Sequence, residues 1–259
     1  MFREDVTVLF ERMAAIGVSP QSRIFEIGTG WLPIFPLCLA LAGFRNIHTV
    51  DLYCHLRESA VRRTLLALHV YTQHPSFQLF ATPDQVEARY QHLLKSSHIL
   101  ETADITYTAP CDASKTSLKP GSLDLIVSNN VFEHVPQPAL LKLFDEAKRL
   151  LRPSGHILHC VNCGDHYAYS DPSITQVNYL QYSNAEWARW NNSLQYQNRL
   201  RPIDFIQMAD GAGFDILSAE YKPNERYLEA LAQMEVAPEF RHYSLDQLAA
   251  TSLTLIASA

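Results

Sequence analysis

The chain has 259 residues, 47% hydrophobic and 19% charged, which is enough to bury a core in one large domain or a core domain with a cap. Its formal net charge of −6, without long basic runs, argues against a nucleic-acid partner. Its apolar runs are shorter than the roughly 18–20 residues that span a membrane, and its acidic, helix-patterned start is not typical of a secretory signal.

The start of the chain predicts a helix and then a strand–turn–helix–strand unit. Apolar residues recur at helical spacing over residues 3–17, within an N-terminal segment 1–19. The unit that follows comprises strand 23–27, helix 33–42 and strand 46–52. This rhythm is typical of a parallel α/β sheet.

The middle of the chain predicts a helical insertion and then further strands. Residues 55–100 are polar and helix-patterned, and they are about twice as many as one crossover helix needs. We therefore expect two or three helices here, some of them covering the site. The elements after the insertion are expected to be strand 104–108, strand 123–128, helix 138–151, a turn at 153–155 and strand 156–162.

The last hundred residues begin with a segment of different composition. Residues 164–200 are rich in Tyr, Trp, Asn and Gln and have poor periodicity, which favours a functional loop or cap over a linker. Helical patterning returns at 202–211, and two last strands are expected at 214–221 and 252–258. The whole fits a single domain over residues 1–259.

The stretch "IFEIGTGWLPIF" is typical of a turn that holds a nucleotide-like ligand. Gly28 and Gly30 permit a sharp turn and a close approach of a ligand to the backbone. Asp51 ends the next strand, where an acid can accept both hydroxyls of a ribose, as in NAD or S-adenosylmethionine. The third glycine of the dinucleotide fingerprint is missing. On the two glycines alone, a turn without any ligand is the alternative.

Several motifs follow one another between residues 109 and 161. They are Asp112-Ala113, "GSLDLI", "EHV" and "LRPSG". In this order they resemble the middle of class I S-adenosylmethionine-dependent methyltransferases, and with the glycine turn the similarity covers about residues 20–162. The resemblance implies an α/β fold with a Rossmann-like, mostly parallel seven-stranded sheet of order 3-2-1-4-5-7-6. Its last strand would be antiparallel, with helices on both faces and a helical insertion or cap.

The resemblance also implies cofactor contacts, residue by residue. Asp51 falls on the ribose-binding acid, Asp112 on the acid that contacts the adenine amine, and Ala113 beside the adenine ring. Asn129 falls where the family faces the methionine moiety. The acid and glycine loop around that moiety corresponds to Glu26, Gly28, Thr29 and Gly30.

These positions have structural alternatives. Asp112 can cap a turn through its side chain, and Asn129 can be a plain turn residue. Glu133 and His134 can cap the helix that follows them. The sequence also departs from the family pattern directly after the glycines and in its long insertion.

Two histidines are candidate general bases for an acceptor that carries a proton. His134 follows strand 123–128, and His166, beside Asp165, follows strand 156–162. Both lie at carboxyl ends of strands, where ligands bind in open α/β sheets. A neutral histidine is a suitable base near pH 7, and a neighbouring acid can orient it. We favour His166; the alternative for each is a loop histidine that only forms hydrogen bonds.

Aromatic and basic residues supply the candidate acceptor pocket. Aromatic rings offer an apolar wall to a planar or cationic acceptor, although some can simply pack a small cap. An arginine can hold a carboxylate or phosphate, or can cap a surface helix. The candidate substrate-binding residues are Trp31, Tyr167, Tyr182, Trp187, Arg199 and Arg201.

No metal site is expected. The stretch "HILHCVNCGDH" holds three histidines and two cysteines, but strand alternation divides them between two faces, and a single C-x-x-C pair is a weak zinc signal. The five cysteines are odd in number and mostly scattered, so we expect reduced thiols and a cytoplasmic protein.

These features predict an enzyme that transfers a methyl group from S-adenosylmethionine to an O or N atom of a small molecule by in-line displacement. One alternative is an NAD(P)-dependent oxidoreductase, disfavoured by the missing glycine. The other is a non-catalytic methyltransferase-like binding protein, disfavoured by the intact turn.

Overall fold

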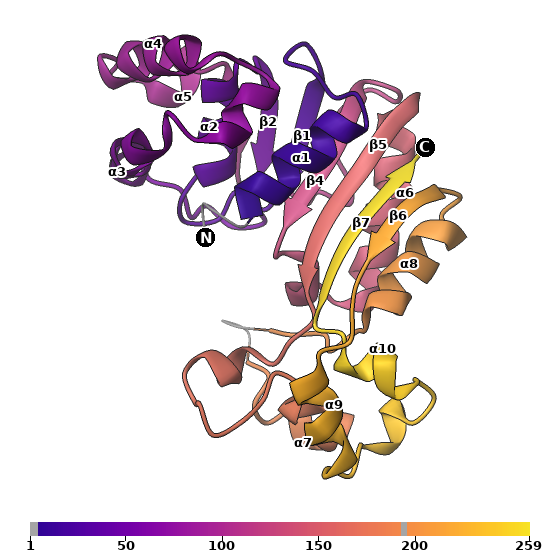
Figure 1. The fold of residues 1–259 in the computed structure, drawn as a ribbon. Coiled ribbons are helices and arrows are strands. Elements are labelled where there is room, and N and C mark those ends of the chain that lie inside the picture. The colour runs from indigo at the N-terminus through magenta and orange to yellow at the C-terminus, as the bar shows by residue number, and fades with distance from the viewer. Residues whose placement is uncertain (1–4, 193–195) are drawn as a thin grey trace. The chain divides into compact units, whose positions relative to one another are not determined.

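The computed structural model describes residues 5–192 and 196–259 (Figure 1). Within these ranges the strands form one sheet in the order β3-β2-β1-β4-β5-β7-β6. β1 (Arg23–Ile27), β2 (Asn46–Val50) and β3 (Ile105–Thr108) pair in parallel, whereas β6 (Asp215–Glu220) and β7 (Ser252–Ser258) pair antiparallel. The strand order and the antiparallel last strand confirm the predicted Rossmann-like sheet.

Contacts between residues divide the chain into two compact units. The first comprises residues 1–127, 149–158 and 259, and the second comprises 128–148 and 159–258. Strands β4 (Leu123–Asn129) and β5 (Leu151–Asn162) each contribute to both units. That residues 1–259 form a single domain stays a prediction.

The first unit contains the N-terminal helix, the parallel strands and the insertion. α1 (Thr7–Ala15) covers part of the predicted segment 1–19, of which residues 1–4 lie outside the described ranges. Phe10 of α1 packs edge-on against Phe77 and Phe80, with ring centroids 5.7 and 5.4 Å apart. The insertion 55–100 contains α3 (Glu58–Leu68), η2 (His69–Tyr71), η3 (Pro75–Leu79), α4 (Pro83–Leu94) and the start of α5 (Ile99–Thr102).

Local sequence sets the ends of the helices in this unit. α2 (Ile34–Ala42) is buried along almost its whole length and ends at Gly43, whose φ of 104° is a left-handed cap that glycine adopts without strain. α4 begins with a capping box, in which Thr82 accepts from the backbone of Gln85 and the Gln85 side chain bonds back. These signals are visible in the sequence, which is why the helices form where their patterns lie.

The second unit places a helical cluster beside its strands. Figure 1 shows α7, α9 and α10 lying together beyond one end of β6 and β7. A buried apolar cluster that includes Val177, Trp187 and Phe240 holds these helices together. The helices of the unit are η4 (Phe132–His134), α6 (Gln137–Leu150), η5 (His166–Tyr169), η6 (Asn178–Gln181), α7 (Asn184–Trp187), α8 (Pro202–Gly211), α9 (Glu225–Ala232), η7 (Pro238–Phe240) and α10 (Leu245–Ala249).

One predicted turn is wrong. Residues 153–155 do not separate the helix from the strand, because β5 already begins at Leu151. Long-range contacts extend the strand: Arg152 Nε pairs with Asp124 Oδ1 at 2.6 Å, and Ala259 N donates to Gly155 O at 2.9 Å. Neither partner is local in sequence, so the Pro-Ser-Gly turn signal misled the prediction.

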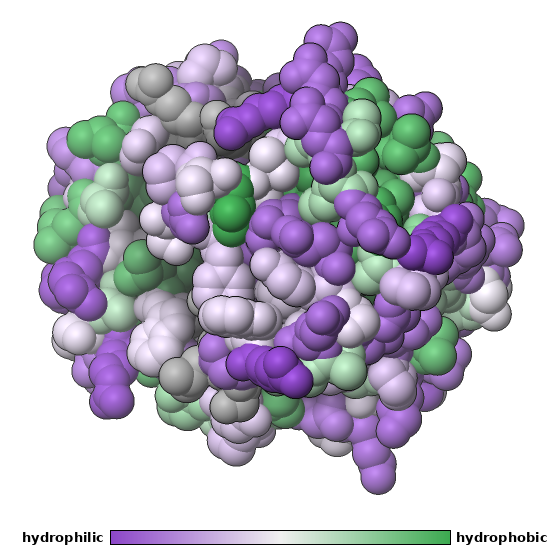
Figure 2. Space-filling model, turned by 90° about the horizontal axis from the view of Figure 1, so that it is seen from below, coloured by the Kyte–Doolittle hydropathy of each residue, from purple (hydrophilic) through white to green (hydrophobic). Residues whose placement is uncertain are grey.

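The molecular surface is mixed in character. Figure 2 shows hydrophilic residues over much of one face, with hydrophobic residues scattered among them. Scattered apolar residues are normal on a protein surface. Across residues 5–192 and 196–259, no helix combines the length and the apolar character that crossing a membrane requires.

Candidate functional site

The glycine turn joins β1 to α2 in the first unit. Gly28 and Gly30 have φ values of 86° and 72°, which residues with a Cβ rarely adopt. A Cβ built on Gly30 meets nothing within 4 Å. Trp31 is 69% exposed, and its ring lies 4.6 Å from that of His55. The turn therefore borders open space in which a ligand can approach the backbone.

Asp51 faces this turn from the end of β2. Its carboxylate accepts from Gly30 N at 3.1 and 3.2 Å and from the Tyr107 hydroxyl at 3.2 Å. Burial raises the pKa of Asp51, and these hydrogen bonds oppose the shift. A carboxylate offers about four lone-pair positions, so Asp51 retains capacity to accept from a ligand hydroxyl.

Glu26 lies beneath the turn and is only 4% exposed. It accepts from Thr49 Oγ1, which also bonds to Thr29 Oγ1 inside the unit. Burial raises the pKa of Glu26 to about 8; the Thr49 bond opposes the shift and the charge of Asp51 adds to it. Glu26 thus supports the turn through buried hydroxyls, and its contact with a cationic cofactor group stays a prediction.

The two predicted adenine-binding residues follow β3. Asp112 is exposed, and its Oδ1 accepts from Ser114 N at 2.9 Å and Ser114 Oγ at 2.7 Å. The turn-capping alternative for Asp112 is therefore present in the structure. Contacts of Asp112 and Ala113 with an adenine stay predictions.

Asn129, the remaining predicted cofactor residue, is the last residue of β4 and belongs to the second unit. Its Oδ1 is buried and has no hydrogen-bond partner among the described residues. The large majority of buried side-chain polar atoms in proteins have a partner, so this oxygen is a candidate contact for a ligand.

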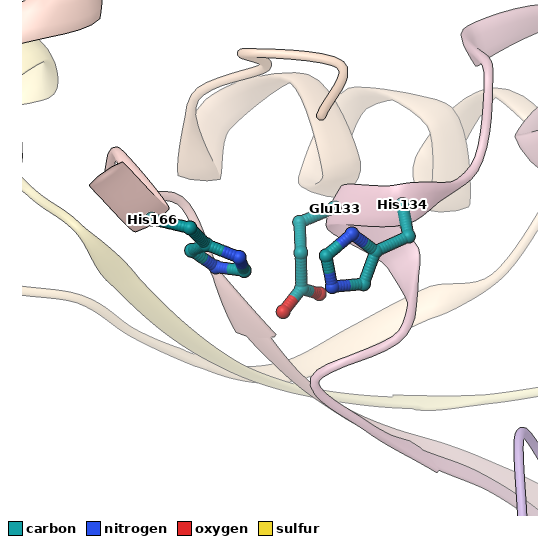
Figure 3. A group of neighbouring side chains, drawn as sticks. All are labelled: Glu133, His134 and His166. Carbon is teal, nitrogen blue, oxygen red and sulfur yellow. The ribbon is translucent and has the colours of Figure 1, made fainter. Parts of the chain in front are cut away.

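Glu133, His134 and His166 come together in the second unit, and we call them the histidine cluster (Figure 3). Glu133 and His134 lie on η4 after β4, and His166 begins η5 after β5. One ligand-capable atom of each lies within 4.8 Å of the others. The two imidazole rings meet edge-on, with centroids 5.1 Å apart. Two strand ends that are about 30 residues apart in sequence thus bring both candidate bases to one place.

Glu133 is the unusual member of the histidine cluster. It is 2% exposed, and both carboxylate oxygens are buried without a hydrogen-bond partner in the described part of the chain. Burial raises the pKa of Glu133 to about 8; the backbone amides of Glu133 and Asn162 oppose the shift, although neither makes a hydrogen bond of standard geometry. The sequence interpretation treated Glu133 only as part of a motif or a cap. The feature of the sequence that could have indicated a role for Glu133 is its position between a buried strand and the candidate base His134.

The two histidines have defined environments. His134 Nδ1 lies 2.7 Å from Tyr196 O, and because a carbonyl only accepts, Nδ1 donates and leaves Nε2 with the lone pair in the neutral ring. His166 Nε2 is buried without a partner among the described residues. Burial, and secondarily the charge of His134, lowers the pKa of His166 to about 4. His166 is therefore uncharged at neutral pH.

Asp165, predicted to orient His166, caps η5. Its buried carboxylate accepts from Tyr167 N at 2.9 Å and Asn178 Nδ2 at 3.4 Å. Burial raises the pKa of Asp165, and these bonds oppose the shift. No hydrogen bond among the described residues joins Asp165 to the His166 ring. The acid that lies beside the ring is Glu133.

Arg199 and Arg201 point into the second unit. Arg199 is 4% exposed and donates to Tyr179 O, Tyr182 O and Asn184 Oδ1 at 2.6 to 2.8 Å. Arg201 is fully buried; it donates to the Tyr179 hydroxyl at 2.9 Å and to a backbone carbonyl of the Ala249–Ala250 segment. These bonds favour a structural role for both guanidiniums.

The predicted aromatic pocket residues fall into two groups, one buried in the cap and one accessible to solvent. Trp187 is 6% exposed and packs edge-on against Tyr179, and Tyr182 packs against the same buried cluster. Tyr167 is 38% exposed, and its hydroxyl donates to Trp190 O at 2.8 Å. Tyr167 thus remains accessible to an acceptor, whereas Trp187 builds the cap. Residues 193–195 of the predicted cap lie outside the described ranges.

Comparison with known proteins identifies the family. The family model described as "Methyltransferase domain" matches residues 3–219. The chain belongs to this methyltransferase family. A search of curated protein sequences finds no match.

Solved structures agree with this methyltransferase fold. An S-adenosylmethionine-dependent methyltransferase from Mesorhizobium loti is 16% identical with a TM-score of 0.51, and the match covers 96% of each chain. Phosphoethanolamine N-methyltransferase 2 from Haemonchus contortus, solved with S-adenosyl-L-methionine, is 16% identical with a TM-score of 0.52; the match covers 98% of this chain and 52% of that one. Geranyl diphosphate C-methyltransferase from Streptomyces coelicolor, solved with Mg²⁺, geranyl diphosphate and S-adenosyl-L-homocysteine, is 12% identical with a TM-score of 0.51, covering 97% and 78%.

Proposed function

We propose that this methyltransferase transfers a methyl group from S-adenosylmethionine to an O or N atom of a small molecule. The observation that carries the proposal is the open space at Gly30, with the Asp51 carboxylate directly beside it. The fold and the family support the same cofactor, and the relatives named above are named for small acceptors of different chemistry.

The residues of the glycine turn fit the cofactor. Gly30 leaves the approach to the backbone free, and Asp51 can accept hydrogen bonds from the ribose hydroxyls. Glu26, Thr29 and Thr49 hold the turn from beneath through their hydrogen bonds. When bound, S-adenosylmethionine supplies a methyl group that its sulfonium already activates. The protein's part is then mainly to align the acceptor and exclude water.

An acceptor that carries a proton must lose it, and we propose that the histidine cluster is where this occurs. The sequence assigns the base to His166, with His134 as the second candidate. The unpartnered Nε2 of His166 supports this assignment. Tyr167, the partly exposed residue after His166, is a proposed contact of the acceptor. Trp31, exposed beside the glycine turn, is a second proposed contact of the acceptor. A cytoplasmic location, proposed from the cysteine pattern, agrees with five free cysteines.

Ligand-induced thermal stabilisation tests the cofactor assignment. S-adenosylhomocysteine should raise the melting temperature, because a ligand that binds only the folded state stabilises it, whereas NAD should not. Equal shifts with both ligands, or none with either, would overturn the proposal. Transfer of a labelled methyl group to fractionated small metabolites then identifies the acceptor. Stabilisation by S-adenosylhomocysteine without transfer to any fraction would favour the non-catalytic alternative.

A further inference from the structure

The histidine cluster offers more ligand atoms than a single general base requires. Glu133 contributes two buried carboxylate oxygens without partners, and His166 contributes a buried Nε2 without one. The Nδ1 bond of His134 to Tyr196 O leaves its Nε2 available. Figure 3 shows the three side chains turned toward one another across a small gap. The gap is thus bordered by four atoms that can donate an electron pair to a cation: both carboxylate oxygens of Glu133 and one ring nitrogen of each histidine.

The unpartnered carboxylate indicates what kind of ligand belongs there. A buried acceptor without a hydrogen bond costs about 1–3 kcal/mol, and more when it is charged. His134 cannot relieve this cost, since its Nε2 is an acceptor too in the tautomer that donates from Nδ1 to Tyr196 O. A cation between the three side chains would satisfy the carboxylate and both rings at once.

We propose that Glu133, His134 and His166 form a divalent metal site of two imidazole nitrogens and one carboxylate. This donor set suits Zn²⁺ and other first-row divalent ions, and it leaves coordination positions open. The hydrogen bond from His134 Nδ1 to a backbone carbonyl is the outer-shell contact that usually orients a metal-bound histidine. On the function proposed above, the open positions would take an oxygen of the acceptor and lower its pKa, so that its proton passes to solvent and not to His166, whose Nε2 is then bound to the metal. The site runs against the sequence expectation of no metal.

The geometry sets a limit on how far the side chains move. Ligand atoms about 2.1 Å from a tetrahedral ion lie about 3.4 Å apart. The three atoms of the histidine cluster lie within 4.8 Å of one another, so metal binding shortens each separation by at most about 1.4 Å. All three residues lie on short helices at strand ends, where side-chain rotation can supply this movement.

Metal titration of the full-length, tag-free, chelator-treated protein tests the site. Co²⁺ should bind at one ion per chain and give visible absorption bands, and Zn²⁺ should displace it. His166→Ala and Glu133→Gln should each weaken Co²⁺ binding by about 100-fold or more, since each removes a direct ligand. The matched control is His92→Ala, an exposed histidine of α4, which should bind Co²⁺ like the parent protein.

Folding and the cofactor are monitored separately. Each variant should keep its circular dichroism spectrum and its thermal stabilisation by S-adenosylhomocysteine. Absence of saturable Co²⁺ and Zn²⁺ binding, or equal binding by His166→Ala and His92→Ala, would overturn the metal site and leave the proposed function standing. Saturable binding of methylammonium without metal binding would also overturn it, in favour of an amine ligand. Metal binding without any S-adenosylhomocysteine effect would instead count against the proposed function alone.

Discussion

Replacing Gly30 with Ala separates the ligand role of the turn from its structural role. Gly30 has a φ of 72° and open space where a Cβ would lie. Gly121, in the turn before β4, has a φ of 63° and the same open space. Adding a Cβ therefore has the same backbone cost at both positions. Only Gly30, however, belongs to the proposed cofactor turn.

The expected magnitudes follow from this comparison. A left-handed conformation costs an alanine roughly 1–2 kcal/mol. The reduced freedom of the unfolded chain returns about 0.4–1 kcal/mol. Both variants should thus lose about 1 kcal/mol of unfolding free energy, which corresponds to about 2–4 °C in melting temperature for a chain of this size. Only Gly30→Ala places a methyl group in the ligand's path, so it should also lose at least about tenfold in cofactor affinity, or about 1.4 kcal/mol.

Calorimetric titration with S-adenosylhomocysteine, together with denaturant unfolding, measures both quantities. The expected pattern is a shared loss of stability and a loss of affinity confined to Gly30→Ala. Parental affinity in Gly30→Ala would refute the placement of the cofactor at this turn. Equal affinity losses in both variants would show that the effect of Gly30→Ala is only backbone strain.

Three further predictions concern Glu26, Arg201 and Trp31. The folded state holds a proton on Glu26 up to about pH 8, whereas the unfolded state releases it near 4.5, so stability falls as pH rises across that window. Glu133, whose pKa is also raised to about 8, contributes a similar loss of stability over this window. Glu26→Gln should therefore remove only the part due to Glu26, about a few kcal/mol between pH 5 and pH 8 in urea unfolding, and an unchanged pH dependence would contradict the shift. Arg201→Met should cost about 2–4 kcal/mol of stability, by leaving the Tyr179 hydroxyl and a backbone carbonyl without their donor, and should not change the acceptor KM. A raised KM at parental stability would return Arg201 to the binding site. Trp31→Ala should keep stability within about 0.5 kcal/mol but raise the acceptor KM, and a lowered melting temperature at parental KM would make Trp31 structural.

Much of the fold was predictable because its signals are local. The glycine turn, the buried α2 and the strands on either side follow from residue spacing within each element and the turn that joins it to the next. The start of β5 was not predictable in this way. It depends on Asp124, which pairs with Arg152, and on Ala259, which donates to Gly155 O. No local pattern encodes contacts over such separations.

The candidate site was predictable to a smaller extent. The proximity of Asp51 to Gly30 follows from parallel pairing of β1 and β2, which brings their carboxyl ends to one edge. The burial of Arg199 could not be predicted from the sequence. In a polar, aromatic segment, the sequence pattern around an arginine is the same whether its side chain faces solvent or the backbone carbonyls of a packed cap. Glu133 was overlooked because burial, not residue type, makes it unusual.

Two buried ionisable side chains in the second unit, Arg201 and Glu133, show how a structural role can be distinguished from a functional one. Arg201 is fully buried, and its two terminal guanidinium nitrogens donate to the Tyr179 hydroxyl and to Ala250 O, while Nε has no partner among the described residues. The fold thus accounts for most of this side chain. Glu133 is as deeply buried, yet neither oxygen has a donor among the described residues. A carboxylate in that state lowers stability unless it is protonated or meets a cation. Protonation accounts for the carboxylate but not for the two imidazoles that lie beside it. A ligand that all three side chains bind accounts for the carboxylate, for both rings and for the carbonyl that orients His134.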